Sequence, residues 1–216
     1  MRRHFDEQIE SLNRGMIEMG ALVEQTIEDA CDALRTADLD KARMVMNGDH
    51  RVDHKEREIE TLCLHLLLQQ QPVARDLRLI SAAMKMITDM ERIGDQAADI
   101  SEIVTMMDLS KPRPDHFRPM AKDAINMVHR AIDAFVNRDT ALAEEVIAAD
   151  DAVDEAFLRV KTELVAMLND HPGLSQEVLD LLMIAKYFER IADHAVNIAE
   201  WVVYAVTGFY KGEELQ

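Results

Sequence analysis

Apolar residues recur every three or four positions along most of the chain, which is the spacing of one face of an α-helix. In the segment 5–36 this face is formed by Leu12, Met16, Met19, Val23, Ile27, Ala30 and Leu34. The same spacing predicts five further helices, over about 39–70, 74–107, 116–137, 140–169 and 175–206. Short breaks separate them, such as "TADLD" (36–40), Pro72 and "DHPG" (170–173). The pattern therefore predicts an all-α protein of six long antiparallel helices.

The second half of the chain repeats the first. "ERIGDQAADISEIV" (91–104) matches "ERIADHAVNIAEWV" (189–202) at an offset of 98 residues. "NGDHRVD" (47–53) matches "AADDAVD" (148–154) at an offset of 101. The difference of three residues falls between the second and third helices of each half, where a loop tolerates an insertion. A repeat of this length indicates two copies of one three-helix unit.

One segment separates the two copies. "LSKPRPD" (109–115) holds two prolines, which a helix interior does not accommodate. Within each half the connections are short, and this favours an up-down-up arrangement. We therefore predict two tandem, pseudo-symmetric three-helix bundles, residues 1–108 and residues 116–216, joined by this linker.

Composition agrees with long helices and restricts the partners. The 216 residues are 48% hydrophobic and include only 7 Gly, 5 Pro and 5% aromatic residues, which favours helices over strands. The net charge of −17 repels nucleic acids and anionic lipids and attracts cations and basic protein surfaces. No apolar run is long enough to cross a bilayer, and the first residues lack a signal peptide's apolar stretch. We expect a cytoplasmic protein that binds no nucleic acid, with Cys31 and Cys63 reduced.

The repeated motif places acids four residues apart on the third helix. Glu91, Asp95 and Asp99 form what we call the first acid ladder. With Leu77 set at zero and about 100° per residue, these acids fall near −40°, 0° and +40°, and Met84 falls near −20°. The ladder is therefore expected to continue the apolar side of the helix, where uncompensated carboxylates are costly.

The same spacing recurs elsewhere in both halves. The second acid ladder is Glu189, Asp193 and Asn197, and the second helix of each half adds an acid pair, Asp49 with Asp53 and Asp150 with Asp154. Like charges at this spacing repel each other. Carboxylate oxygens are the ligands that hard cations prefer, and facing helices of a bundle complete such sites. The two ladders are therefore predicted to bind metal ions, with the acid pairs as additional candidate ligands.

Chance and polar contacts are the alternatives. Among 41 acidic residues, pairs at this spacing arise often and usually lie on a solvated helix face. Acids at matching places in both halves argue against chance. His194, beside Asp193, could add a nitrogen ligand, but its counterpart in the repeat is Gln96, which favours a polar contact. The segment "QQQPVARDLR" (69–78) is predicted to be only a polar turn before a helix.

Four stretches resemble the PhoU family of phosphate-uptake regulators, and together they span nearly the whole chain. They are "LLLQQQPVARDLRLI" (66–80), "MERIGDQAADI" (90–100), "VIAADDAVD" (146–154) and "KYFERIADHAVNIAEWVVYAVTG" (186–208). The resemblance implies two similar three-helix bundles side by side. It also implies that the E/D-x-x-x-D motifs bind metal ions, here through Glu91, Asp95, Asp99, Glu189 and Asp193. Asn197 offers an oxygen without a charge, so the second site is expected to bind metal more weakly.

The resemblance further implies a regulatory role without enzymatic activity. The family negatively regulates the phosphate-starvation response by linking a phosphate ABC transporter to a sensor histidine kinase. The expected protein is a cytoplasmic, metal-binding adaptor whose partners are the transporter's ATPase subunit and that kinase, and it reaches the membrane only through them. The expected metals are iron, manganese, zinc or magnesium, and a homodimer is one candidate assembly.

Two other classes of function stay open. One is a carboxylate-bridged, metal-dependent oxidase or hydrolase on a helical bundle. Redox di-iron bundles pair their glutamates with Glu-x-x-His histidines. This chain has no histidine at that spacing after Glu91 or Glu189, which counts against the enzyme. The other class is a purely structural helical protein.

Overall fold

The structure, a computed structural model, describes residues 2–70, 72–111, 114 and 116–214. The first half of the described chain contains α1 (Arg2–Thr36), α2 (Leu39–Gly48), α3 (His50–Gln70) and α4 (Ala74–Met106). The second half contains α5 (Phe117–Asn137), α6 (Thr140–Asp170), the short 3-10 helix η1 (Pro172–Leu174) and α7 (Ser175–Thr207). A small antiparallel hairpin, β1 (Phe209–Tyr210) with β2 (Glu213–Glu214), follows α7.

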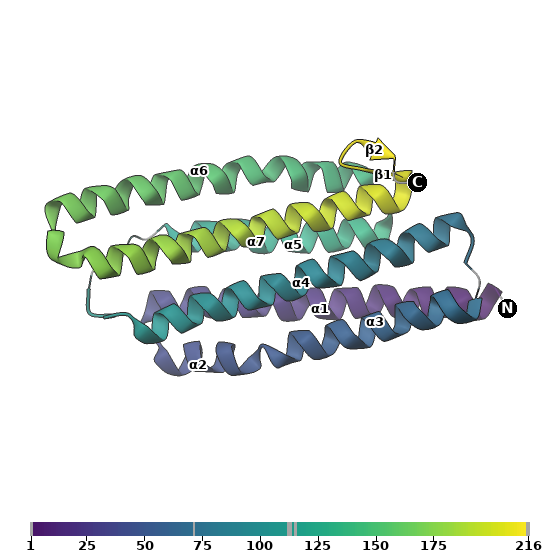
Figure 1. Cartoon of the computed structure of the whole chain (residues 1–216), viewed down its shortest axis with the longest axis horizontal. Helices are drawn as coiled ribbons and strands as arrows, with labels where there is room; N and C mark the ends of the chain where they lie inside the picture. The colour runs from purple at the N-terminus through teal and green to yellow at the C-terminus, as the bar shows by residue number, and fades with distance from the viewer. Residues whose placement is uncertain (1, 71, 112–113, 115, 215–216) are drawn as a thin grey trace.

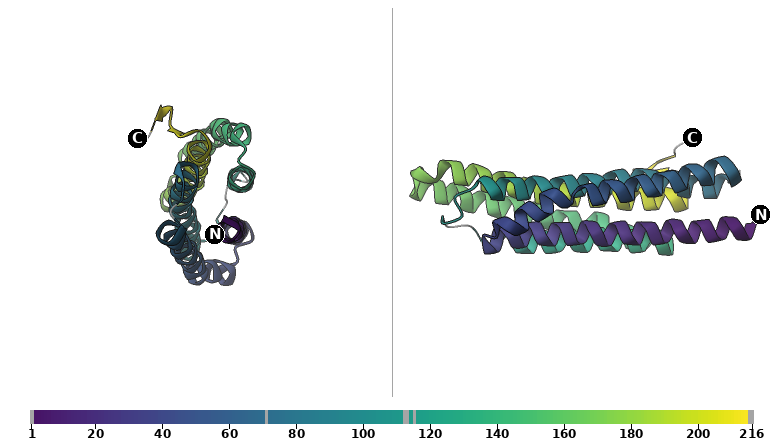
Figure 2. Two further views of the ribbon diagram at one scale, coloured as in Figure 1. Left: turned by 90° about the vertical axis from the view of Figure 1, so that its right-hand side faces the viewer. Right: turned by 90° about the horizontal axis from the view of Figure 1, so that it is seen from below.

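The helices run lengthwise and form two bundles that lie side by side (Figures 1 and 2). Helix α4 packs against α7 more extensively than any other pair of elements does. Helix α1 packs against α5 as well, so the first and third helices of each half build the contact between the halves. The predicted fold class, tandem three-helix bundles, is confirmed. The exact boundaries of the bundles stay a prediction, and residues 112, 113 and 115 of the linker lie outside the described residues.

The second predicted helix is in two pieces, which the sequence analysis did not foresee. The break lies between Gly48 and His50, at Asp49. Glycine is a poor helix former, and nothing lies within 4 Å of the position where a Cβ of Gly48 would be. At an offset of 101 its counterpart is Ala149, inside the continuous α6. A single glycine therefore accounts for the local difference.

The end of the first helix is built alike in both halves. Ala37 and Arg138 both adopt the left-handed conformation, with φ of 57° and 59°. Each is followed by an aspartate, Asp38 or Asp139, whose side chain accepts a hydrogen bond from a backbone N–H of the next helix. The offset between the two turns is again 101, so the repeat extends to backbone geometry.

The predicted core of the first helix is confirmed, since all seven of its stripe residues are buried. The predicted face of the first acid ladder is wrong. With Leu77 at zero, the buried residues Met86, Met90 and Ala97 lie near 180°, 220° and 200°. Leu77 itself is 45% exposed. The first acid ladder therefore lies opposite the centre of the buried face, because the leucine taken as the reference is not part of the core.

Candidate functional site

The first acid ladder is partly buried although it lies away from the core, because α3 packs alongside α4. Asp49 precedes α3 and reaches toward Gly94, where a Cβ would lie 3.5 Å from its Oδ1. Asp53, on α3, repels both Glu91 and Asp95. The structure thus brings the predicted acid pair of the second helix to the predicted ladder of the third. We call this group, with the residue described next, the first acid cluster.

Glu56 is a member of the first acid cluster that the sequence analysis missed. Its side chain is partly buried, its charge acts on Glu91, and it lies 3.5 Å from the hydroxyl of Thr88. Its place one turn after Asp53 was the available signal. The repeat hid it, because its counterpart at an offset of 101 is Phe157.

Burial and mutual repulsion raise the pKa of several carboxyls in the first acid cluster. Burial raises the pKa of Asp49, and the charges of Asp95, Asp53 and Asp99 raise it further. Burial likewise raises the pKa of Glu91, with Asp95 next in effect. Arg92 opposes this, since it lies 3.6 Å from Glu91 and 3.4 Å from Asp95. One exposed arginine thus contacts two rungs of the ladder.

The second acid cluster consists of Asp150, Asp154, Glu189 and Asp193. Burial, followed by the charges of Asp154, Asp193 and Glu189, raises the pKa of Asp150 to about 6. Glu189 is the most enclosed of the ladder acids and forms an ion pair with Lys186. Asp154 and Asp193 are exposed, so solvent screens them more than their counterparts in the first cluster.

The last rung of each ladder contacts the other half of the molecule. The amide of Asn197 on α7 donates to Asp89 on α4 at 3.3 Å, and Nδ1 of His194 lies 2.8 Å from the same carboxylate oxygen. Conversely, Tyr187 on α7 interacts with Asp99 on α4; burial raises the pKa of Tyr187, and this carboxylate raises it further. The polar contact predicted for His194 is confirmed.

These two contacts are related by the repeat. Asp89 and Tyr187 are 98 residues apart, and so are Asp99 and Asn197. An exchange of equivalent positions across one contact is the property of a two-fold arrangement. The contact between α4 and α7 is therefore pseudo-two-fold, and Asp89 is a polar member of it that the sequence analysis missed.

The donor chemistry of both clusters suits a cation. Asp49 and its counterpart Asp150 each have a buried Oδ1 without a hydrogen-bond partner among the described residues. A cation would satisfy both orphaned oxygens and reduce the repulsion. Among the same residues, however, no three His, Cys, Asp or Glu side chains lie close enough together to hold a metal ion. The metal ligands therefore stay a prediction, and binding would require side-chain rotation.

Among the described helices, none combines the length and apolar composition that crossing a membrane requires.

Comparisons with known proteins match the whole architecture. The family model described as "PhoU domain" matches residues 16–104 and 117–202. A phosphate-specific transport system accessory protein PhoU homolog of Burkholderia is 36% identical, over 94% of this chain and 89% of that protein. The accessory protein PhoU of Escherichia coli is 31% identical, over 94% of this chain and 86% of that protein.

Solved structures agree with these sequence matches. The crystal structure of PhoU from Pseudomonas aeruginosa has a TM-score of 0.88 at 35% identity, covering 95% of this chain and 100% of that one. The phosphate transport system regulatory protein PhoU from Streptococcus pneumoniae has a TM-score of 0.88 at 27% identity, covering 98% and 99%. The likeness therefore extends over both bundles in fold as well as in sequence.

Proposed function

The chain belongs to the PhoU family, and on that basis we propose that it is an accessory protein of a phosphate-specific transport system that negatively regulates phosphate uptake. The observation that carries this proposal is the family match in both halves, together with relatives named as accessory proteins of phosphate transport. The proposed role is that of a cytoplasmic adaptor without enzymatic activity. It would link the transporter's ATPase subunit to a sensor histidine kinase and so repress the phosphate-starvation response.

The charge of the protein supports an adaptor for basic surfaces. A net charge of −17 attracts positively charged partner surfaces and speeds their association. Screening acts over about 8 Å at physiological ionic strength, so this association would slow steeply with added salt. The membrane would be reached only through these partners.

Metal binding belongs to the same proposal. Glu91, Asp95 and Asp99 would hold a cation in the first half, with Asp49 and Asp53 beside them. In the second half the cation would be held by Glu189, Asp193 and Asn197, with Asp150 and Asp154. The cation, whether iron, manganese, zinc or magnesium, would supply the positive charge that each cluster lacks. The carboxylates would bind it by rotating toward one another, and this would lower the raised pKa values described above.

Gene deletion tests the regulatory role. Cells without this protein should express phosphate-starvation genes even when phosphate is plentiful, and the wild-type gene should restore repression. A variant with reversed surface charges and an intact fold should fail to restore it. Normal repression in the deletion strain would contradict the proposal.

A turnover assay tests the enzyme alternative directly. The purified, metal-loaded protein should neither hydrolyse a phosphate ester nor consume oxygen. If it does either, and if substitution of Glu91 or Glu189 abolishes that turnover, the adaptor proposal is wrong and the enzyme takes its place.

A further inference from the structure

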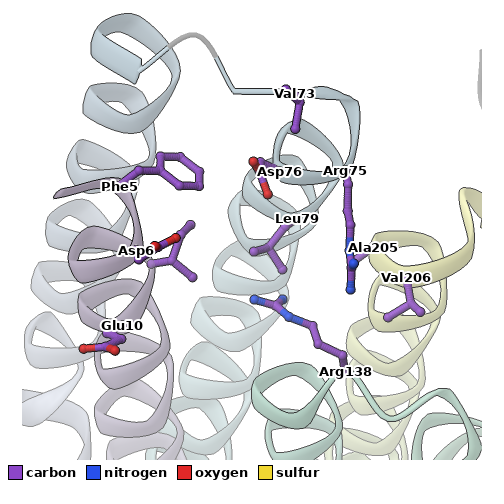
Figure 3. Close-up of a pocket in the computed structure, with 11 residues that line it drawn as sticks. Phe5, Asp6, Glu10, Val73, Arg75, Asp76, Leu79, Arg138, Ala205 and Val206 are labelled. Carbon is purple, nitrogen blue, oxygen red and sulfur yellow. The ribbon is translucent and has the colours of Figure 1, made fainter. Parts of the chain in front are cut away.

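A separate cavity lies at the end of the molecule where α1 and α4 begin and α7 ends (Figures 1 and 3). Its volume is about 430 Å³, and it opens between α1, α4, α7 and Arg138, the residue that follows α5. Pockets that bind small molecules usually measure about 300–1,000 Å³. Both halves of the chain line this cavity, and neither acid cluster contributes a residue to it.

Three arginines gather at this cavity, and two of them have buried nitrogens without partners. Nη1 of Arg138 and Nε of Arg78 are enclosed, and neither has a hydrogen-bond partner among the described residues. Arg75, one turn before Arg78, lines the cavity with Arg138, and Figure 3 shows these two side chains reaching toward a shared space. Buried donors without acceptors are uncommon in native proteins. An acceptor with several oxygens would satisfy them.

The surroundings of Arg138 add to the demand for a negative group. Burial lowers the pKa of Arg138, and the like charge of Arg75 lowers it further, while Asp76 opposes the effect. The guanidinium lies 5.2 Å from the ring centroid of Phe135, a contact with the face of the group that leaves its N–H donors in the plane. Arginine forks of this kind bind phosphate oxygens in pairs.

The start of α4 supplies further donors. Val73 precedes the helix and provides no side-chain cap, so the first backbone N–H groups of α4 lack that partner. The N-terminus of a helix carries a partial positive charge, which favours anions. Arg75 lies in this first turn, so side-chain and backbone donors lie close together.

The opposite wall of the cavity has a different character. Asp6 and Glu10 on α1, together with Asp76, line it beside the apolar Phe5 and Leu79 (Figure 3). Carboxylates accept hydrogen bonds from hydroxyl and amino groups. The cavity therefore matches a molecule with an anionic group at one end and hydrogen-bond donors at the other.

We propose that this cavity binds a phosphate group, held by Arg75, Arg78 and Arg138 at the start of α4. The phosphate comes either from a small phosphorylated molecule, whose hydroxyl or amino groups face the acidic wall, or from inorganic phosphate. The segment that looked from sequence like a polar turn before a helix is then part of a binding site. This inference stands on the geometry of the cavity and does not depend on the metal clusters or on the proposed adaptor role.

Calorimetric titration of the full-length protein tests the site. Ribose 5-phosphate, inorganic phosphate and unphosphorylated ribose are titrated at one constant ionic strength. We expect saturable binding of ribose 5-phosphate, weaker binding of inorganic phosphate and none of ribose. Equal affinity for the two phosphates would support the site and assign it to the free anion. No saturable binding of either phosphate, or equal binding of ribose, would overturn the proposal.

The repeat offers a matched pair of variants. Arg138→Gly removes the guanidinium and leaves a residue that adopts the left-handed conformation without strain. Ala37→Gly makes the same backbone change at the equivalent turn of the first half, without loss of charge. We expect Arg138→Gly to weaken phosphate binding by roughly tenfold to a hundredfold, the range for a lost charge-assisted hydrogen bond, and Ala37→Gly to leave it unchanged.

Arg78→Gln keeps the test decisive if Arg138→Gly does not fold, since it removes the charge from a different helix. Unchanged affinity in every arginine variant that folds would overturn the assignment. The adaptor role is judged separately by gene expression in the deletion strain, so one proposal can fail while the other stands.

Discussion

The two halves of the molecule have the same fold but different acid clusters. In the first, Glu56 lies beside Thr88. At the equivalent positions of the second half, Lys186 lies over the ring of Phe157, 5.6 Å from its centroid. The second cluster has thus lost an acid and gained a lysine, which pairs with Glu189. A fold can therefore be duplicated exactly while its two sites come to differ by two units of charge.

This difference sets an order of expected affinities for cations. The first cluster carries more acids, and most of them are partly buried, where charges interact more strongly. The second balances part of its charge internally through Lys186. We therefore expect the first half to bind metal more tightly, in the same order that the neutral Asn197 suggests.

The largest expected effect is loss of metal from one half at a time. Glu91→Ala with Asp95→Ala should remove the metal of the first half, and Glu189→Ala with Asp193→Ala that of the second. Removal of repelling carboxylates should leave helicity intact. Elemental analysis of protein purified without chelator measures the metal, and circular dichroism measures the helicity. Full metal content in the first double variant would contradict the assignment of that ladder.

An exchange of the two second-turn residues should shift the affinities in opposite directions. Lys186→Thr makes the second cluster resemble the first, and Thr88→Lys does the reverse. Because one charge near a partly buried cation contributes about 1 kcal/mol, each change should alter the affinity of its own half by roughly fivefold. Competition with a metal indicator in each single variant measures this. Shifts of the same sign in both variants would show that charge does not set the difference.

A smaller effect concerns pH and the raised pKa of Asp150. A carboxyl whose pKa is about 6 in the folded protein and 3.8 in the unfolded chain is harder to ionise when folded. It therefore costs no stability below pH 3.8, and it destabilises the fold progressively as pH rises toward 6. Asp150→Asn should stabilise the metal-free protein by about 1 kcal/mol at pH 7, after allowance for solvent screening.

Urea unfolding in the presence of a chelator measures this stabilisation, and the effect should vanish at pH 4. Asp49→Asn, the counterpart in the first half, should act with the same sign. A variant of Asp150 that is less stable than the wild type at pH 7 would show that this carboxylate has a stabilising contact.

The smallest expected effect tests the break between α2 and α3. Gly48→Ala should stabilise the protein by about 0.5–1 kcal/mol, because Gly48 is helical and space is open around it. The matched change Ala149→Gly should destabilise the protein by a similar amount. Both follow from thermal or urea unfolding. Destabilisation by Gly48→Ala would mean that the break is needed for packing.

Internal repetition made the architecture predictable from the sequence. The offsets of 98 and 101 located equivalent helices, and the turns at Ala37 and Arg138 follow the same offset. The break at Gly48 was missed because apolar periodicity continues on both sides of it. The face of the first acid ladder was wrong because α4 is covered on several sides, so an exposed leucine resembles a core residue in the pattern.

The members of the site that were missed share one property. Glu56 and Asp89 have Phe157 and Tyr187 as their counterparts, so a search for acids conserved between the halves passes over them. The arginines of the cavity were missed for a related reason. They converge from α4 and from the end of α5, and no spacing within one helix reveals such a contact. Repeats therefore predict what the halves share and hide what distinguishes them.

The pseudo-two-fold contact between α4 and α7 has a consequence for how such a chain could have evolved. A single three-helix unit would leave one face of its third helix bare, and a second copy would cover it, as in an ancestral homodimer before gene duplication and fusion. In the present chain that self-pairing is no longer favourable for the first half, because Asp89 would meet Asp99 of a second copy. Once Asn197 and Tyr187 had replaced one acid in each contact, the fused gene could not separate again into two identical products.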